Sequence, residues 1–228
     1  MLDLEKHDAL LPLSDSQVAQ MSMATSRYQE ALMVGEDKPF DYLLGRGLSA
    51  ETVTMFRLGV VDDPLAEHMK YNGMISIPYL DAEGKNTYTH RFRCLKDHSC
   101  KENHHGKYNS VAGSGTRIFN IRAIQEADAE IHVAEGEFDA MILTQCGMPA
   151  VAAPGANTWQ PRHTVMLGGF ERVYIWGDPD EAGAKFANAL QSALQGVAVQ
   201  VRLRDNDVTD TYLEGGKDSL MKALEEVR

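Results

Sequence analysis

Apolar side chains recur at helical spacing in the first part of the chain. Ser14 and Gln17 have the spacing of a capping box, and the apolar positions after them fit one helical face. Ser49 is the expected N-cap of a later helix, which Gly59 is expected to close. The sequence therefore predicts a compact helical opening, with helices over residues 14–34, 40–44 and 50–57.

The pattern then changes from helical spacing to alternation. Two apolar runs, 74–80 and 87–94, flank a turn sequence at 81–84, which predicts a β-hairpin. Residues 95–116 are polar and glycine-rich, which is typical of a loop. With the helices before them, these features predict an N-terminal α+β subdomain over residues 1–125.

After residue 126 short apolar runs alternate with helical patterns. The strands are expected over residues 131–134, 149–153, 172–177 and 197–203, and the helices over 137–146, 160–167, 181–195 and 217–227. Such alternation favours a mostly parallel sheet with helices on both faces. Residues 126–228 are therefore predicted to form a C-terminal α/β domain.

An acidic pair follows the predicted strand that ends near Trp176. Asp178 and Asp180 leave this strand two positions apart, so both carboxylates can turn toward one hard cation. Ligands of open α/β sheets bind beyond the carboxyl ends of the strands, which is where this pair falls. Gly183 keeps the next helix close. Magnesium is the expected ion, because it binds one or two carboxylates together with phosphate oxygens.

A second acidic stretch follows an earlier predicted strand. Glu135 stands directly after the apolar run 131–134, and Asp139 lies four residues further on in the next helix. With Asp178 and Asp180 these residues make an acidic cluster possible at one edge of the sheet. The simpler reading is that each acid only complements the dipole at a helix N-terminus.

The charge distribution narrows the range of partners. The chain has a net charge of −11, which argues against a free-standing, nonspecific nucleic-acid binder. Residues 85–122 nevertheless carry eight basic residues and two acids, and a phosphate-facing surface is expected there. There is no signal-peptide layout or long apolar run, so a cytoplasmic protein without a membrane partner is expected.

The acidic motifs resemble those of Toprim domains, the metal-binding modules of bacterial primases, topoisomerases and some nucleases. The E-G-x-x-D of residues 135–139 and the D-x-D-x-x-G of residues 178–183 match the two motifs of that family. Asp207 and Asp210 resemble the further acidic motif of primases. The fold class implied is a Toprim domain with a parallel sheet, preceded by an α+β subdomain.

Four segments before these motifs resemble the polymerase core of bacterial primases. They are R-G-L-S at 46–49, F-R-L-G at 56–59, I-P-Y-L-D-A-E-G at 77–84 and K-Y-N-S at 107–110. The resemblance implies a DNA primase core of phage type, a DNA-directed RNA polymerase that makes short RNA primers on single-stranded DNA from NTPs. It also implies a core without a zinc ribbon or a helicase part. A replicative helicase or a separate zinc-binding protein is then the expected partner for template recognition.

The resemblance also implies roles for particular residues. The catalytic group would be Glu135, Asp139, Asp178 and Asp180. The ligands of Mg²⁺ or Mn²⁺ would be Glu135, Asp178, Asp180, Asp207 and Asp210, with Glu135 as either a ligand or the general base. Asp207 and Asp210 would otherwise belong to a solvated loop. The contacts to template or NTP would be Arg46, Arg91, Arg93, Lys107, Tyr108 and Arg117, of which Tyr108 either stacks on a base or is half-buried in a strand.

Two other functions use the same acids. A Toprim nuclease would cleave phosphodiesters, and a Toprim recombination mediator would bind DNA without catalysis. The R-G-L-S and K-Y-N-S segments favour a primase over both. Zinc is not expected, although Cys94, His98, Cys100 and either His104 or His105 lie close in sequence. Their spacing is not a common structural zinc pattern, so these histidines are interpreted as facing solvent or phosphate.

Overall fold

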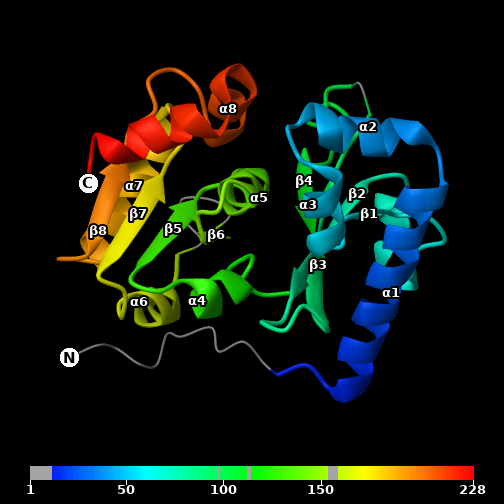
Figure 1. Cartoon of the computed structure of the whole chain (residues 1–228). Coiled ribbons are helices and arrows are strands. Elements are labelled where there is room, and N and C mark those ends of the chain that lie inside the picture. Colours follow the sequence, from blue (N-terminus) through cyan, green and yellow to red (C-terminus); the bar gives the residue numbers. More distant parts are fainter. Residues whose placement is uncertain (1–11, 97, 112–113, 154–158) are drawn as a thin grey trace.

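The computed structural model describes residues 12–96, 98–111, 114–153 and 159–228. It contains two four-stranded sheets that lie side by side (Figure 1), one antiparallel with the order β1-β2-β3-β4 and one parallel with the order β6-β5-β7-β8. No helix in the described part of the chain has the length and apolar character needed to cross a bilayer. The mixed architecture confirms the predicted fold class.

The first sheet is accompanied by the N-terminal helices. Its elements, with one short 3-10 helix η2, are α1 (Asp15–Val34), α2 (Asp37–Gly45), α3 (Ala50–Met55), β1 (Gly59–Val60), η2 (Ala66–Tyr71), β2 (Ile75–Leu80), β3 (Thr87–Arg93) and β4 (Tyr108–Ser110). The Ser14 capping box and the Ser49 cap are both present. The hairpin of β2 and β3 pairs Ile77 with Arg91 in antiparallel register. These predictions are confirmed.

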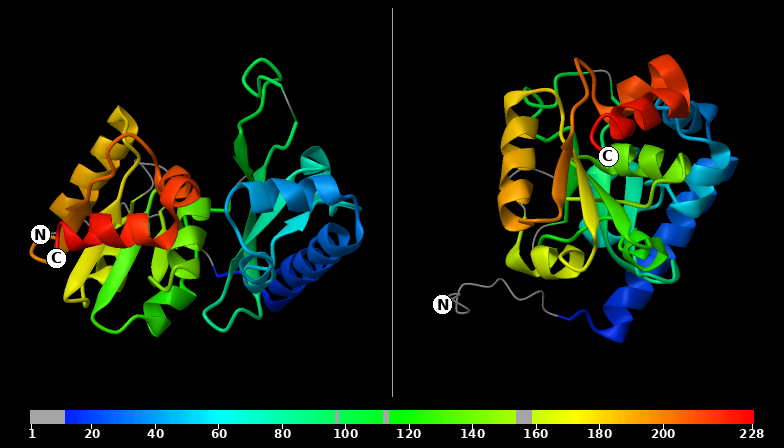
Figure 2. Two further views of the ribbon diagram at one scale, coloured as in Figure 1. Left: turned by 45° about the horizontal axis from the view of Figure 1, so that its top comes forward. Right: turned by 60° about the vertical axis from the view of Figure 1, so that its left-hand side comes forward.

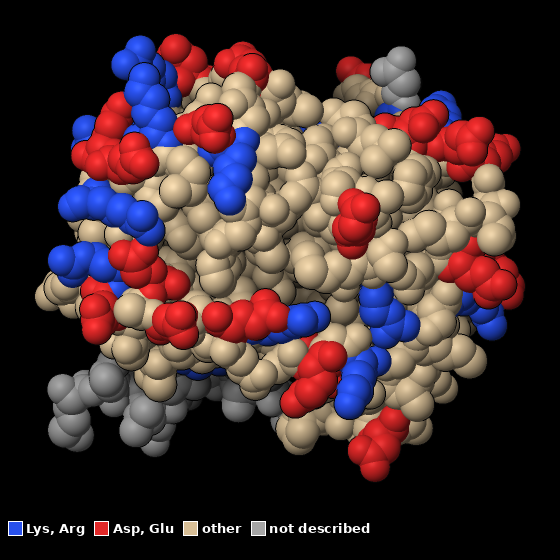
Figure 3. Space-filling view, viewed as in Figure 1, with Lys and Arg blue, Asp and Glu red and all other residues tan. Residues whose placement is uncertain are grey.

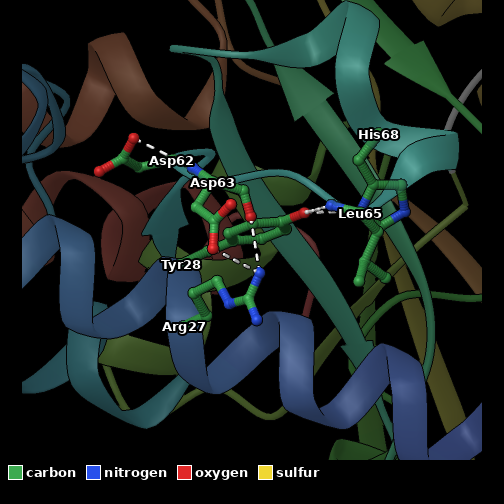
Figure 4. Close-up of polar contacts among 6 residues, drawn as sticks. All are labelled: Arg27, Tyr28, Asp62, Asp63, Leu65 and His68. Atoms are coloured by element: carbon green, nitrogen blue, oxygen red, sulfur yellow. Dashed lines mark hydrogen bonds and ion pairs between the residues drawn. The ribbon is translucent and has the colours of Figure 1, made fainter.

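Helix α1 is attached to this sheet through buried polar contacts. The Tyr28 hydroxyl lies 2.9 Å from His68 Nδ1 and accepts a hydrogen bond from the Leu65 amide, as Figure 4 shows. At the surface, Arg27 forms an ion pair with Asp63 at 2.8 Å. A Cβ on Gly59 would lie 2.4 Å from the Tyr28 carbonyl carbon, so glycine permits the close approach of β1 to α1.

The second sheet is covered by helices on both faces (Figures 1 and 2). Its elements are α4 (Arg122–Glu126), β5 (Glu130–Ala134), α5 (Glu137–Gln145), β6 (Ala150–Ala152), α6 (Pro161–Leu167), β7 (Arg172–Trp176), α7 (Glu181–Ala193), β8 (Ala198–Val201) and α8 (Val208–Glu225). One face packs against α5 and α8, and the other packs against α4, α6 and α7. The parallel sheet with two covered faces is confirmed.

The two sheets share one apolar core. A single cluster of buried side chains includes Leu43 and Ile77 from the first part of the chain and Met141 and Trp176 from the second. Gln145 of α5 adds polar contacts across this junction. Its Oε1 accepts from the Ser49 amide and from the Thr52 hydroxyl, each at 2.7 Å. The acidic edge of the second sheet is therefore held at a fixed position beside α2 and β4.

Three local predictions were wrong. The helical segment over residues 208–215, which Asp207 caps, was not predicted; the non-helical Gly216, with φ of 66°, separates it from the predicted helix that starts at residue 217, and the two together are α8. Gly59 lies in β1, and Arg57, with φ of 52°, takes the left-handed position that follows α3. The segment that leads out of the predicted loop is a third antiparallel partner, β4. The division at residue 126 stays a prediction.

Candidate metal and phosphate site

The acids that follow two neighbouring strands lie at one edge of the parallel sheet. In the register of β5 and β7, Ala134 pairs with Trp176, so Glu135 and Gly177 leave the sheet side by side. Figure 1 shows both strands running in the same direction toward the end of the sheet near α8. Asp178 and Asp180 follow within four residues of Trp176. The sheet topology thus brings the two sequence motifs together, as predicted.

The loop after β7 is closed tightly by two glycines. A Cβ on Gly183 would lie 2.1 Å from the Asp178 carbonyl oxygen, and one on Gly177 would lie 2.7 Å from the Gly183 carbonyl oxygen. Asp180 is the N-cap of α7, and its Oδ1 accepts from the Gly183 amide at 2.8 Å. One Asp180 oxygen is thus used for capping, and the helix start is held against the acidic pair.

Asp139 is buried and connects α5 to α8. Its Oδ1 accepts from the Thr209 amide at 3.1 Å and from the Thr209 hydroxyl at 2.6 Å. Asp207 caps α8 by accepting from the Asp210 amide at 2.7 Å. Asp207 and Asp210 therefore belong to a helix N-terminus and not to a solvated loop, and Asp139 supports the position of that helix.

Mutual repulsion and burial raise the pKa values of three of these acids. The pKa of Glu135 is raised to about 7, first by burial and then by the charges of Asp178 and Asp180. Burial and the charge of Asp207 raise the pKa of Asp139 to about 7. The pKa of Asp178 rises to about 6 through burial and through Asp207, while Arg46 opposes the rise. The six predicted acids thus act electrostatically as one cluster.

The donor set of this cluster fits a divalent hard cation. All of its side-chain donors are carboxylate oxygens, and Glu135 Oε2 is buried without a hydrogen-bond partner. Within the described residues, the tight groups of potential ligands include no set of three carboxylates. An open arrangement of this kind suits magnesium or manganese, which also bind water and phosphate oxygens.

Three cations stand beside the acidic edge. Lys107 lies close to Arg93 and Arg46, and their charges, with burial, lower its pKa. The charge of Arg46 also lowers the pKa of Asp178, so Arg46 lies within electrostatic range of both the acids and the other two cations. In the described part of the chain none of the three forms an ion pair with an acid, and the Nε atoms of Arg46 and Arg93 are buried without partners. Cations held together without counter-charges indicate an anion site.

The R-G-L-S segment positions Arg46. Gly47 has φ of 83°, which favours glycine, and a Cβ there would lie 3.0 Å from the ring of Tyr212. The Gly47 carbonyl accepts from Gln145 Nε2 at 2.9 Å. The guanidinium of Arg46 lies over the Phe138 ring at 5.4 Å. Contacts with α5 and α8 therefore fix this arginine beside the acids.

Tyr108 is a packed residue of β4. It lies beneath two guanidinium groups, with Arg93 at 4.7 Å and Arg91 at 5.1 Å from its ring centre. Burial raises the pKa of its hydroxyl. Of the two predicted roles, the half-buried strand tyrosine describes its position, and the ring supports the cations from below.

The other predicted cations are placed differently. Arg91 forms an ion pair with Glu137 at 2.7 Å, and the Tyr79 hydroxyl donates to the same oxygen at 2.7 Å. Sequence reasoning missed Glu137, because an acid in the first turn of a helix is usually exposed to solvent and complements the helix dipole. Arg117 stacks over Tyr88 at 5.5 Å and shares with Arg91 a cleft beside β3. Neither arginine belongs to the group around Lys107.

A cleft beside the acidic pair contains two further arginines. Asp178 and Asp180 line it from one side, and Arg202 and Arg204, which follow β8, line it with them. Their position directly after a strand at the same sheet edge is the signal that could have found them.

In the view of Figure 3 charged side chains lie mainly around the margins, and the middle of that face is largely uncharged.

Comparison with known families and proteins agrees with this geometry. The family model described as Toprim-like matches residues 132–212, a range that contains all six acids. The Gene 57 protein of Mycobacterium phage D29 is 29% identical over 157 residues, which cover 68% of this chain and 99% of that protein.

Solved primase structures have the same fold. The zinc-binding and RNA polymerase domains of Aquifex aeolicus primase give a TM-score of 0.79 at 21% identity, covering 100% of this chain and 64% of that one. The RNA polymerase domain of Mycobacterium tuberculosis primase gives 0.77 at 20% identity, with 94% and 84% covered. The primase fragment of bacteriophage T7 gives 0.61 at 22% identity, with 79% and 72% covered.

The comparisons define the class of fold. Residues 132–212 match the Toprim-like family model, and with the N-terminal sheet the chain has the fold of a primase catalytic core. The predicted resemblance is confirmed at this level. The present chain spans 64% of the length of the Aquifex fragment. The activity and the partners of the whole protein are therefore proposed and not read from this similarity.

Proposed function

We propose that this chain is the catalytic core of a DNA primase that makes short RNA primers on single-stranded DNA by nucleotidyl transfer from NTPs. The observation that carries the proposal is the position of Arg46. The charge of this arginine acts both on Asp178 of the acidic edge and on Lys107, which is close to Arg93. A nucleoside triphosphate bound through a divalent ion needs this combination of carboxylates and cations at close range.

Metal binding, phosphate binding and proton transfer then fall to different residues of the site. Asp178 and Asp180 hold the divalent ion, which supplies charge stabilisation for the attacked α-phosphate when bound. Arg46, Arg93 and Lys107 bind the phosphate oxygens. Glu135 has a pKa of about 7, so at neutral pH it serves either as a further ligand or as the acceptor of the 3′-hydroxyl proton.

The remaining acids hold the site in shape. Asp139 keeps the start of α8 in place through Thr209. Asp207 and Asp210 complete the negative edge that a second ion or the incoming nucleotide would meet. Because the chain has a net charge of −11, strong attachment to DNA calls for a further protein. A replicative helicase or a zinc-binding recognition protein fits that role.

The test is incorporation of labelled ATP on single-stranded DNA with Mg²⁺ or Mn²⁺. Wild type is compared with Asp178→Asn/Asp180→Asn. The matched control is Asp128→Asn/Glu171→Gln, which changes two exposed acids at the opposite edge of the same sheet. Short RNA products are expected from wild type and the control, with a loss of about 10³-fold or more in the first variant.

The integrity of the template is followed in the same reactions. Cut template without RNA would replace the primase with a Toprim nuclease. If binding of single-stranded DNA occurs without either reaction, even with helicase and the other replication proteins of its host added, the chain is a recombination mediator. Either result would overturn the proposed polymerase activity.

A further inference from the structure

The loop between β3 and β4 brings four metal-ligating side chains together. Its described residues are 94–96 and 98–107, and it is closed at its base by a hydrogen bond from the Cys94 amide to the Lys107 carbonyl at 3.0 Å. The left panel of Figure 2 shows it reaching away from both sheets. One ligand atom from each of Cys94, His98, Cys100 and His105 lies within 4.8 Å of the other three.

The distances approach those of a tetrahedral site. Cys94 Sγ lies 3.6 Å from His98 Nε2. This equals the separation of about 3.6 Å that Zn–S and Zn–N bonds of about 2.3 and 2.05 Å give at a tetrahedral angle. The Sγ atoms of Cys94 and Cys100 lie within 4.8 Å of each other. Because all four ligand atoms lie within 4.8 Å of one another, the widest pair needs to close by at most about 1.0–1.5 Å to reach that geometry.

The surroundings orient the ligands. The nearest partner of His105 Nδ1 is the Gly106 carbonyl oxygen at 2.9 Å. A carbonyl only accepts, so Nδ1 carries the proton and Nε2 presents its lone pair to a metal, as is usual for ligating histidines. The His105 amide donates to the Cys100 carbonyl at 3.0 Å, which closes the turn between these two ligands. His104, with φ of 56°, lies outside the group.

We propose that Cys94, His98, Cys100 and His105 bind one Zn²⁺ ion as a structural site. Two thiolates and two imidazoles are a donor set that zinc prefers, and a site with four protein ligands is closed to substrate. The sequence argued against zinc because the spacing of these residues is not a common structural zinc pattern, and it left His104 and His105 as equal candidates for the last ligand. The folded loop selects His105.

The ion would fix a loop next to the cation group. Cys94 follows Arg93 directly, and Lys107 forms the base of the loop. Zinc would therefore hold two of the three cations that stand beside the acidic edge. This consequence rests on the proposed function, whereas the zinc site itself does not.

The first test is the metal content of the full chain, purified by gel filtration in zinc-containing buffer and then freed of excess metal. We expect close to one zinc per wild-type chain by mass spectrometry, and close to none in Cys100→Ser and His105→Ala. The matched controls are His104→Ala, in which the neighbouring histidine is removed, and Asp178→Asn/Asp180→Asn. Both controls should keep the ion, which separates this site from the acidic edge.

The second test uses Co²⁺ in place of zinc on the wild-type chain, so that it does not depend on whether the variants fold. A tetrahedral site with thiolates gives strong visible absorption and a sulfur-to-metal charge-transfer band, which added Zn²⁺ should remove. Circular dichroism shows which variants are folded.

Zinc far below one per chain together with weak cobalt absorption would overturn the proposal. A mass lower by two hydrogens before reduction would also overturn it, because it would show a Cys94–Cys100 disulfide. Loss of primer synthesis with intact zinc binding would affect only the proposed function.

Discussion

Both halves of the molecule bury titratable groups, but they do so in different ways. In the N-terminal half, Tyr28 contacts His68, and Thr25 contacts His90 Nε2 at 2.8 Å. Burial lowers the pKa of His68, and it lowers that of His90 to about 3 with help from the charges of His68 and Arg57. These rings are neutral at neutral pH and need no counter-charge, so we assign them a structural role.

The acidic edge of the second sheet is built from groups that repel one another. Glu135, Asp139 and Asp178 all have raised pKa values, and neighbouring acids contribute to each rise. Near neutral pH these carboxylates begin to ionise without a cation among them. The comparison teaches that burial alone does not indicate a binding site. Burial combined with like charges at a strand end does, because it leaves a charge for a ligand to balance.

Glu135→Gln should separate function from stability most strongly. Primer synthesis is expected to fall by about 10²-fold or more, whether Glu135 acts as a ligand or as a base. The folded protein without metal should be more stable at pH 8 than wild type, because one repelling charge is removed. Activity assays and thermal unfolding in EDTA measure the two effects. A variant that is both active and less stable would show that Glu135 is a structural residue.

Arg46→Ala tests whether the cation group serves the acidic edge. Loss of a charged hydrogen-bond donor is expected to lower kcat/KM for NTP by about 10- to 100-fold. Arg122→Ala is the control, since Arg122 is an exposed member of an ion pair with Glu126. Steady-state incorporation at varied NTP concentration gives the values. Equal effects of the two substitutions would place the bound phosphates elsewhere.

Magnesium should stabilise the protein more at pH 8 than at pH 5. The raised carboxyl pKa values mean that the folded chain keeps protons that the unfolded chain releases between about pH 4 and pH 7, so its stability falls as pH rises through that window. A bound cation offsets this loss. At 100 times its Kd it adds about 3 kcal/mol, or roughly 5–10 °C in Tm at this chain length. A thermal shift that is the same at both pH values would contradict the assigned repulsion.

The buried histidines should give the opposite dependence on pH. His90 has a pKa lowered to about 3, so below about pH 6.5 the unfolded chain binds a proton that the folded chain excludes. Its contribution is lost as pH falls, by at most about 1.4 kcal/mol per pH unit. The free energies of unfolding of wild type and His90→Gln, measured by denaturant titration between pH 4.5 and 7, should therefore change with pH at different rates. The same dependence on pH in both proteins would mean that His90 is accessible to protons.

The sequence predicted those features that depend on local pattern. The strands β5 and β7 and their following acids were found because each is an apolar run that is followed closely by acids and then by a helical pattern. The first part of α8, over residues 208–215, was missed because it is polar and is followed by Gly216, which ends it. The Asp207 cap starts this segment.

Tertiary contacts set the limit of what could be predicted. Nothing local to Arg46 indicates that Gln145, about a hundred residues away, holds its neighbour Gly47. Glu137 was missed because only the folded chain brings Arg91 and Tyr79 to it. The convergence of Cys94 with Cys100 and the two histidines likewise depends on closure of the loop by the Lys107 carbonyl.

Direct binding of Mn²⁺ tests the central claim, that the acidic edge holds a divalent ion. Zinc-loaded protein at pH 8 is titrated with Mn²⁺, and free Mn²⁺ is followed by electron paramagnetic resonance. We predict saturable binding in wild type and in Asp128→Asn/Glu171→Gln, and its loss in Asp178→Asn/Asp180→Asn. Equal binding by all three proteins would contradict the assignment, because the ion would then be held by residues other than the acids at this edge.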